Sequence, residues 1–226
     1  MWNALHWGRW EEALRRANWA GRGVSPVVVA RVKAQALAGL GRLDEALRVV
    51  KPFGDGRTVP EWFYRMTLAD VLDSAHRYDE AIAQLEEGVD AASDNATLLL
   101  SLARRVLTHE RDVGRARALL DEARAHAMSD LLAPFADLQE GLILVEEGRP
   151  HEALAVLEPV LEVFRARRHM PLGELPVEGT MIGLALAKAA LGESDEALRL
   201  YAKARPRLVA LGSPNLDRYD RAIGWP

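Results

Sequence analysis

Cysteine is absent from this chain of 226 residues, and only four of its 29 basic residues are lysines. Without cysteine there is no disulfide, thiolate zinc site, iron–sulfur cluster or cysteine nucleophile, which is compatible with a reducing compartment. The net charge of −4 argues against direct binding of nucleic acid, which usually requires a basic face. The preference for arginine over lysine favours a bacterial source with a GC-rich genome.

Long apolar runs are missing as well. The longest, such as 97–103 and 182–187, are far shorter than the roughly 20 residues that span a bilayer. Residues 1–7 do not have the basic segment and apolar run of a secretory signal. We therefore expect a cytoplasmic protein that has no membrane partner.

Patterns typical of catalytic or cofactor sites are also lacking. None of the six histidines has a second histidine at the spacing that places two metal ligands on one helix face, and His151-Glu152 only begins like a zinc-protease motif. The glycine pairs in 21–23 and 54–56 lack the Lys and Ser/Thr of a phosphate-binding loop. We expect no catalytic residue, no metal and no cofactor, and a protein that is not an enzyme.

What the sequence does contain is a repeated seven-residue segment. One copy reads Gly41-Arg42-Leu43-Asp44-Glu45-Ala46-Leu47. The copies occupy residues 8–14, 41–47, 76–82, 111–117, 148–154 and 192–198, and the fourth matches least well. They share the alanines Ala13, Ala46, Ala81, Ala116, Ala153 and Ala197, which follow one another at steps of 33, 35, 35, 37 and 44 residues.

The residue types of this segment predict the corner between two helices. A glycine or polar residue can adopt the left-handed conformation that ends a helix, and an Asp near the next N-terminus satisfies free N–H groups and the helix dipole. The alanine then lies where two helices cross closely. Around each corner the apolar residues recur at spacings of three, four or seven, which indicates helices, and we find no strand pattern.

The pattern resembles the tetratricopeptide repeat family, in which small residues occupy positions 8 and 20 of the unit. The alanines above match position 20, and Ala34, Ala69, Gly141 and Ala185 match position 8. Arg104 departs from it in the fourth repeat, and the 44-residue step implies a loop around residues 170–176. The resemblance implies an all-α, right-handed superhelical solenoid of antiparallel helix pairs, with about 11–13 helices.

We expect a single repeat domain over residues 1–226. It would consist of a partial first repeat at 1–24, repeats at about 25–56, 60–93, 95–128, 131–169 and 176–211, and a C-terminal cap at 213–226. Within the cap, Ser213-Pro214-Asn215 is expected to start a short helix over residues 216–223.

The family register also predicts an inner groove with an apolar floor and a few polar side chains. Its lining would be Arg31, Gln35, Phe63, Met66, Asp70, Leu98, Ser101, Arg105, Phe135, Leu138, Gln139, Leu142 and Ile182. Such a lining suits an amphipathic helix or an extended peptide. The alternative is that several of these residues pack between repeats.

Four of the six tryptophans lie near the N-terminus. Trp10 holds the aromatic position of the first corner and should be in the core. Trp2, Trp7 and Trp19 belong to a repeat without a full first helix, so they could form an apolar edge for docking or homo-oligomerisation. Alternatively, they fold back as an N-terminal cap.

These features predict a scaffold or adaptor that binds a protein or peptide through the groove and the N-terminal edge. The alternative function is the sensor or oligomerisation region of a bacterial transcription regulator, because longer repeats of this kind occur in the helical sensor regions of such activators.

Overall fold

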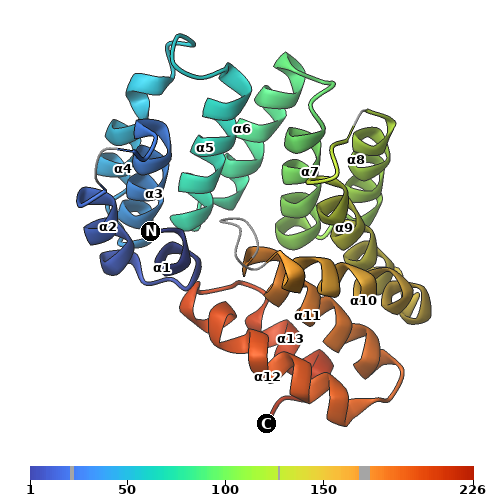
Figure 1. Cartoon of the computed structure of the whole chain (residues 1–226). Coiled ribbons are helices and arrows are strands. Elements are labelled where there is room, and N and C mark those ends of the chain that lie inside the picture. The colour runs from blue at the N-terminus through green and yellow to red at the C-terminus, as the bar shows by residue number, and fades with distance from the viewer. Residues whose placement is uncertain (21–22, 127, 168–173) are drawn as a thin grey trace. The chain divides into compact units, whose positions relative to one another are not determined.

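A computed structural model shows an all-helical protein (Figure 1). It describes residues 1–20, 23–126, 128–167 and 174–226, and these contain thirteen α-helices and no strand. The elements are α1 (Trp2–His6), α2 (Trp10–Asn18), α3 (Pro26–Gly39), α4 (Leu43–Val50), the 3₁₀ turn η1 (Lys51–Phe53), α5 (Glu61–Ser74), α6 (Tyr78–Ala91), α7 (Ala96–Arg105), the π turn η2 (Val106–Glu110), α8 (Val113–Ala125), α9 (Ala133–Glu146), α10 (Pro150–Ala166), α11 (Glu174–Ala190), α12 (Ser194–Ala210) and α13 (Leu216–Ile223).

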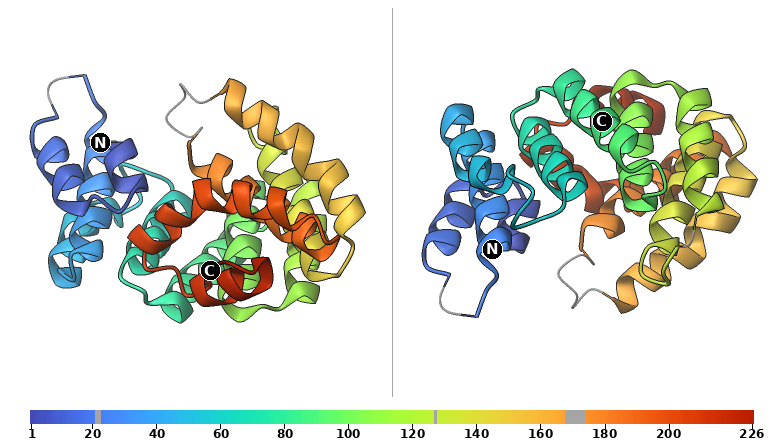
Figure 2. Two further views of the ribbon diagram at one scale, coloured as in Figure 1. Left: turned by 90° about the horizontal axis from the view of Figure 1, so that it is seen from below. Right: turned by 90° about the horizontal axis from the view of Figure 1, so that it is seen from above.

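The helices pair in chain order. α3 packs against α4, α5 against α6, α9 against α10 and α11 against α12, each pair being joined by a short corner (Figures 1 and 2). We call the first helix of a pair the A helix and the second the B helix. The predicted all-α fold of tetratricopeptide-like helix pairs is confirmed.

Six corner residues adopt the left-handed conformation, with φ between 58° and 81°. They are the first residues of the six repeated segments, namely Gly8, Gly41, His76, Arg111, Gly148 and Gly192. In the second corner, the N–H of Arg42 donates to the carbonyl of Leu37 at 2.9 Å, which closes the end of the A helix. The predicted helix ends are confirmed, although two corners use a residue that has a Cβ.

The predicted role of the acidic residues at the B-helix N-termini needs a correction. Among the described B helices, Asp112 alone caps its helix with its side chain, by accepting from the N–H of Arg115 at 2.9 Å. In the second corner, Arg42 is the N-cap and donates to both carboxylate oxygens of Glu45 at 2.7 Å. That hydrogen bond lowers the pKa of Glu45. Here the acid lies in the first helical turn, where it favours the helix dipole without capping a free N–H.

The small residues of the repeat lie at the closest helix contacts. All six shared alanines are fully buried, as are Ala34, Ala69 and Ala185. Gly141 of α9 is also buried, and a Cβ at this position would lie 2.3 Å from a methyl carbon of Leu157 on α10. A larger side chain would push these helices apart.

Arg104 does not occupy the small position of the fourth repeat. Its side chain is exposed, whereas the neighbouring Ala103 is fully buried. Ala116 follows Ala103 by thirteen positions, one more than Ala46 follows Ala34. The π turn η2 takes up the extra residue, because a π turn contains one more residue than an α turn. The sequence register was therefore wrong by one residue here.

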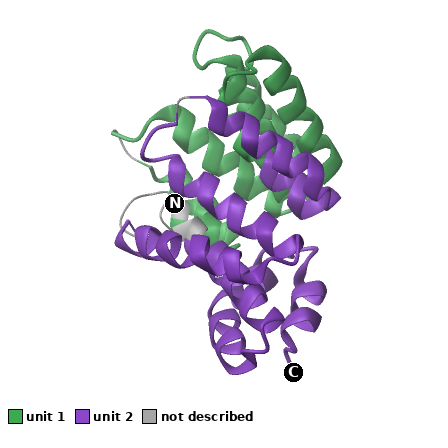
Figure 3. Cartoon of the chain, turned by 90° about the vertical axis from the view of Figure 1, so that its right-hand side faces the viewer, with its two compact units in different colours: residues 1–102 green, residues 103–226 purple. Residues whose placement is uncertain are grey.

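The chain divides into two compact units (Figure 3). Unit 1 contains Met1–Leu102 and unit 2 contains Ala103–Pro226. The organisation as one repeat domain stays a prediction. The predicted loop at 170–176 lies mostly outside the described residues, and α11 already begins within it, at Glu174.

Candidate functional site

Predicted groove residues of unit 1 meet where α5 packs against α3. Arg31 on α3 donates from Nη2 to Asp70 Oδ2 on α5 at 2.5 Å, and the two side chains are 22% and 16% exposed. The Arg31 guanidinium also lies 5.8 Å from the centre of the Phe63 ring. Gln35 and Met66, from the same two helices, are buried. The structure therefore brings Arg31, Phe63 and Asp70 together at one position that solvent can reach.

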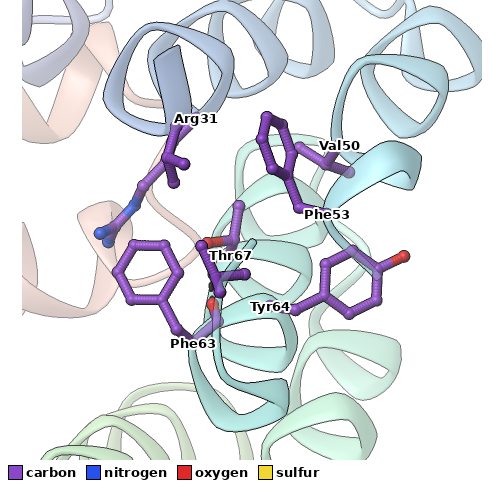
Figure 4. A pocket seen from close by; sticks show the side chains of 8 residues that line it. Arg31, Val50, Phe53, Phe63, Tyr64 and Thr67 are labelled. Atoms are coloured by element: carbon purple, nitrogen blue, oxygen red, sulfur yellow. Dashed lines mark hydrogen bonds between the residues drawn. The ribbon is translucent and has the colours of Figure 1, made fainter. Parts of the chain in front are cut away.

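A shallow depression lies beside this ion pair (Figure 4). Its lining consists of Val27, Arg31, Val50, Phe53, Val59, Phe63, Tyr64 and Thr67. Its volume is about 10 Å³, which is room for one water-sized sphere. Small-molecule pockets usually measure about 300–1,000 Å³. The depression thus has room for about one water molecule and is too small for a cofactor.

The local sequence explains the position of the turn and loop that line one side of the depression. Pro52 has no N–H to continue the α4 ladder, so the chain tightens after Val50 into the 3₁₀ turn that carries Phe53. The following loop passes close to α5, because a Cβ on Gly54 would lie 2.8 Å from the ring of Tyr64. The loop thereby lies against Tyr64 of α5, next to the turn that carries Phe53.

The predicted groove residues of α7 are mostly interior. Leu98 is fully buried, and its methyl carbons lie 3.4 Å from where a Cβ on Gly88 would be placed. Arg105 is 1% exposed, and Ser101 is partly exposed. A charged residue at position 98 would disrupt packing, so this position cannot report on binding alone.

The predicted groove residues of unit 2 also belong largely to the core. Leu138 and Ile182 lie in one buried cluster, against which Phe135 and Leu142 pack while partly exposed. Gln139 is 4% exposed, and no described residue bonds its Oε1. Seven of the thirteen predicted lining residues are thus buried, which leaves Arg31, Phe63, Asp70, Ser101, Phe135 and Leu142 with exposed surface.

Sequence reasoning missed the contacts of α13, although its bounds match the predicted helix. Arg218 donates to both Glu146 carboxylate oxygens on α9, at 2.7 and 2.9 Å. Asn215 is the N-cap residue, but its side-chain amide donates to the carbonyl of Thr108 at 2.9 Å instead of capping its own helix. These partners are 72 and 107 residues away, so no local pattern could have indicated them.

Asp220 anchors α13 to α12. It accepts from Arg205 at 2.8 and 2.7 Å and from the Tyr201 hydroxyl at 2.6 Å. The hydrogen bond from Arg205 lowers the pKa of Asp220, against an opposing effect of burial. Burial, followed by the bond to Asp220, raises the pKa of Tyr201. Trp225 completes this anchor, with its ring 5.2 Å from the Arg205 guanidinium.

The tryptophans of the predicted N-terminal edge differ in how far their side chains are exposed. Trp19 is 88% exposed, directly after α2, whereas Trp7 is partly buried against His6. The side chain of Trp2 lies outside the described residues. Trp10 packs in the N-terminal core, and a Cβ on Gly39 would lie 2.5 Å from its ring.

Within the described ranges, no three His, Asp or Glu side chains are grouped so that they could hold a metal ion. In the same part of the chain, no helix has the length and apolar character needed to cross a membrane.

Comparison with known proteins identifies the repeat. A tetratricopeptide repeat model matches residues 27–51, 134–159 and 179–203, which correspond to α3 with α4, α9 with α10 and α11 with α12. No curated protein matches the chain. A crystal structure of nearly identical TPR-like repeats, attributed to a kinesin light chain of Podosopora anserina and carrying one substitution, is similar with a TM-score of 0.51 and 19% identity. The match covers 81% of this chain and 94% of that one, and at this identity it supports the fold alone.

Proposed function

Because this chain is a tetratricopeptide-like repeat protein, we propose that it is a scaffold whose unit 1 binds a protein segment on the face formed by α3 and α5. The observation that supports this most is the partly exposed Arg31–Asp70 pair beside an apolar depression. Peptide sites typically combine a pocket for an apolar side chain with a few polar groups that set orientation.

The chemistry of the face defines its ligand. An extended peptide or an amphipathic helix would lay one apolar side chain over the depression, against Phe63 and Phe53. The charged pair next to it would then contact a polar group of the ligand backbone or a side chain. We propose no catalytic role, and we propose the cytoplasm as the compartment, which the absence of cysteine supports.

The test begins with selection of ligands from a displayed library of random peptides against the whole chain. Affinities of the selected peptides are then measured by fluorescence anisotropy. Phe63→Ser should weaken binding at least about tenfold, since it removes an aromatic wall of the depression. Arg48→Ala is the matched control, because Arg48 is exposed on α4 and bonds only the Asp44 carbonyl of its own helix among the described contacts. Equal affinity of Phe63→Ser and the wild type would contradict the site.

A charge exchange separates binding from stability at the same position. The double variant Arg31→Asp/Asp70→Arg retains an ion pair with the charges reversed. If the ligand contacts these charges, the single variant Arg31→Asp lowers stability and binding, and the double variant restores stability only. Restored binding in the double variant would show that the pair acts solely in folding.

We propose that the N-terminal edge is a second contact surface, supported by the side chain of Trp19, which is 88% exposed. If this ring mediates homo-oligomerisation, Trp19→Ser should lower the sedimentation coefficient of the chain. If the wild type and Trp19→Ser both sediment as monomers, the edge does not mediate homo-oligomerisation. The alternative of a transcription-regulator region stays a prediction that no described contact favours.

A further inference from the structure

The terminal helix α13 lies at the end of the A-helix face of unit 2. Phe135, Gln139 and Leu142 share one side of α9, being four and three residues apart, and Glu146 continues that side four residues later. Arg218 of α13 binds the carboxylate of Glu146. The helix therefore contacts the very side of α9 that the sequence assigned to a ligand.

Two further contacts join α13 to the neighbouring A helices. The amide of Asn215 bonds the carbonyl of Thr108 in the π turn that follows α7. Tyr219 packs against the apolar cluster that contains Leu138 of α9 and Ile182 of α11. Figure 2 shows α13 in dark red beside α12, against which it also packs. A backbone carbonyl after α7 and side chains of α9 and α11 thus contact one short helix.

The attachment of α13 combines the polar contacts above with one small apolar contact, in which Ile223 joins a buried cluster with Ala185, Ala197 and Tyr201. Among its eight residues only Ile223 is buried, and its ion pairs with Glu146 and Arg205 are partly exposed. A helix of eight residues is not stable in water without its packing partners. The connection to α12 is short and contains Gly212, with a φ of 61°. Its docking can therefore be lost while the helix pairs remain packed.

We propose that α13 is an intramolecular occupant of the A-helix face of unit 2, and that an amphipathic helix presenting an arginine beside an aromatic residue displaces it. The arginine and the aromatic residue of such a helix would take the places of Arg218 and Tyr219, which already contact this face. The use of this exchange in regulation rests on the proposed scaffold function. Because a short linker gives α13 an effective concentration of roughly millimolar, a free helix competes only when its own affinity is high or α13 is weakened.

The experiment uses the full chain and a fluorescent peptide of residues 213–226. Arg218→Ala weakens the tethered helix and leaves Glu146 available, so this variant should bind the peptide about tenfold more tightly than the wild type. Glu146→Gln is the matched control, since it also loosens α13 but removes the charge that the peptide arginine requires. It should show no gain. Equal affinities of the two variants, or no gain in Arg218→Ala, would overturn the proposal.

Hydrogen exchange of the wild type provides a second measurement that needs no variant. The amides of α13 should exchange at least about tenfold faster than those of α9 and α11, because α13 opens alone. Protection equal to that of α9 would make α13 a fixed part of the core and overturn the proposal.

These results are independent of peptide binding in unit 1. Phe63→Ser should bind the 213–226 peptide as the wild type does. Equal binding of the selected peptides by Phe63→Ser and the wild type would therefore contradict the proposed function and leave the exchange of α13 standing.

Discussion

The A-helix faces of the two units differ in what covers them. In unit 1, Arg31 and Phe63 remain partly exposed beside an apolar depression. In unit 2, Leu138 and Ile182 are buried, and α13 engages Glu146 at the end of the same side. In unit 2 a segment outside the helix pairs thus binds one end of the face, while Phe135 and Leu142 on the same face stay partly exposed. Similarity of the repeats alone consequently does not identify a binding surface.

The largest expected change in the free energy of unfolding comes from glycine-to-alanine substitutions, which compare helix packing in the two units. Gly141→Ala places a Cβ 2.3 Å from Leu157, so it should lower the free energy of unfolding by about 2–3 kcal/mol through overpacking. Gly88→Ala in unit 1 meets its nearest atom at 3.3 Å and gains helix propensity, so its effect should stay within about 1 kcal/mol. Urea denaturation measures both. Similar losses would mean that the two helix contacts are equally tight.

A smaller loss of stability is expected when the contacts of Asp220 that hold α13 to α12 are removed. Unit 1 has no such helix among its described elements. Asp220→Ala leaves the fully buried Tyr201 without its acceptor and should cost about 1–3 kcal/mol. Asp220→Asn keeps an acceptor and should cost less. Thermal unfolding of the two variants gives the comparison. If both substitutions cost the same, the hydroxyl bond contributes nothing.

Each unit has one corner in which a residue with a Cβ holds a positive φ, His76 in unit 1 and Arg111 in unit 2. Arg111→Gly should stabilise the chain by about 0.5–1 kcal/mol, because relief of left-handed strain exceeds the added entropy of the unfolded chain. His76→Gly should gain less, since His76 Nδ1 lies 2.6 Å from the Tyr78 hydroxyl and this contact is lost. Calorimetric melting temperatures test both. A fall in either would show that the corner side chain matters more than its strain.

Acidification should have the smallest effect, and it should act on unit 2 through Asp220. The pKa of Asp220 lies below its ordinary value of 3.8, so its contribution to stability is present above that value and is lost as pH falls through the folded-state pKa. Protection of α13 amides should accordingly fall below about pH 4. Asp220→Asn should flatten this dependence. An unchanged acid response in that variant would assign the effect to other carboxylates.

The helices and their corners could be predicted because local residues determine them. The alanines that meet at helix crossings and the glycines that end the A helices recur in a readable pattern. The π turn was missed because the sequence pattern does not show where one extra residue lies. It assigned the small position to Arg104 when the adjacent Ala103 occupies it. The structure, not the pattern, shows which of the two is buried.

The candidate site was harder to predict, because burial depends on segments far along the chain. Leu98 has the residue type and register of a groove position, yet it packs near Gly88 in the interior. The bond between Asn215 and Thr108 joins residues 107 positions apart. By contrast, the pairing of Arg31 with Asp70 links equivalent sides of successive A helices, and the repeat register placed both on one face.

The most direct test of the proposed binding face is hydrogen exchange of the full wild-type chain with and without a saturating peptide selected for binding. We predict added protection on α3 and α5, together with the loop that carries Phe53, and little change on α9 and α11. Protection confined to the B helices, or to α9 and α11 with none on α3 and α5, would contradict the assignment of binding to the accessible face of unit 1.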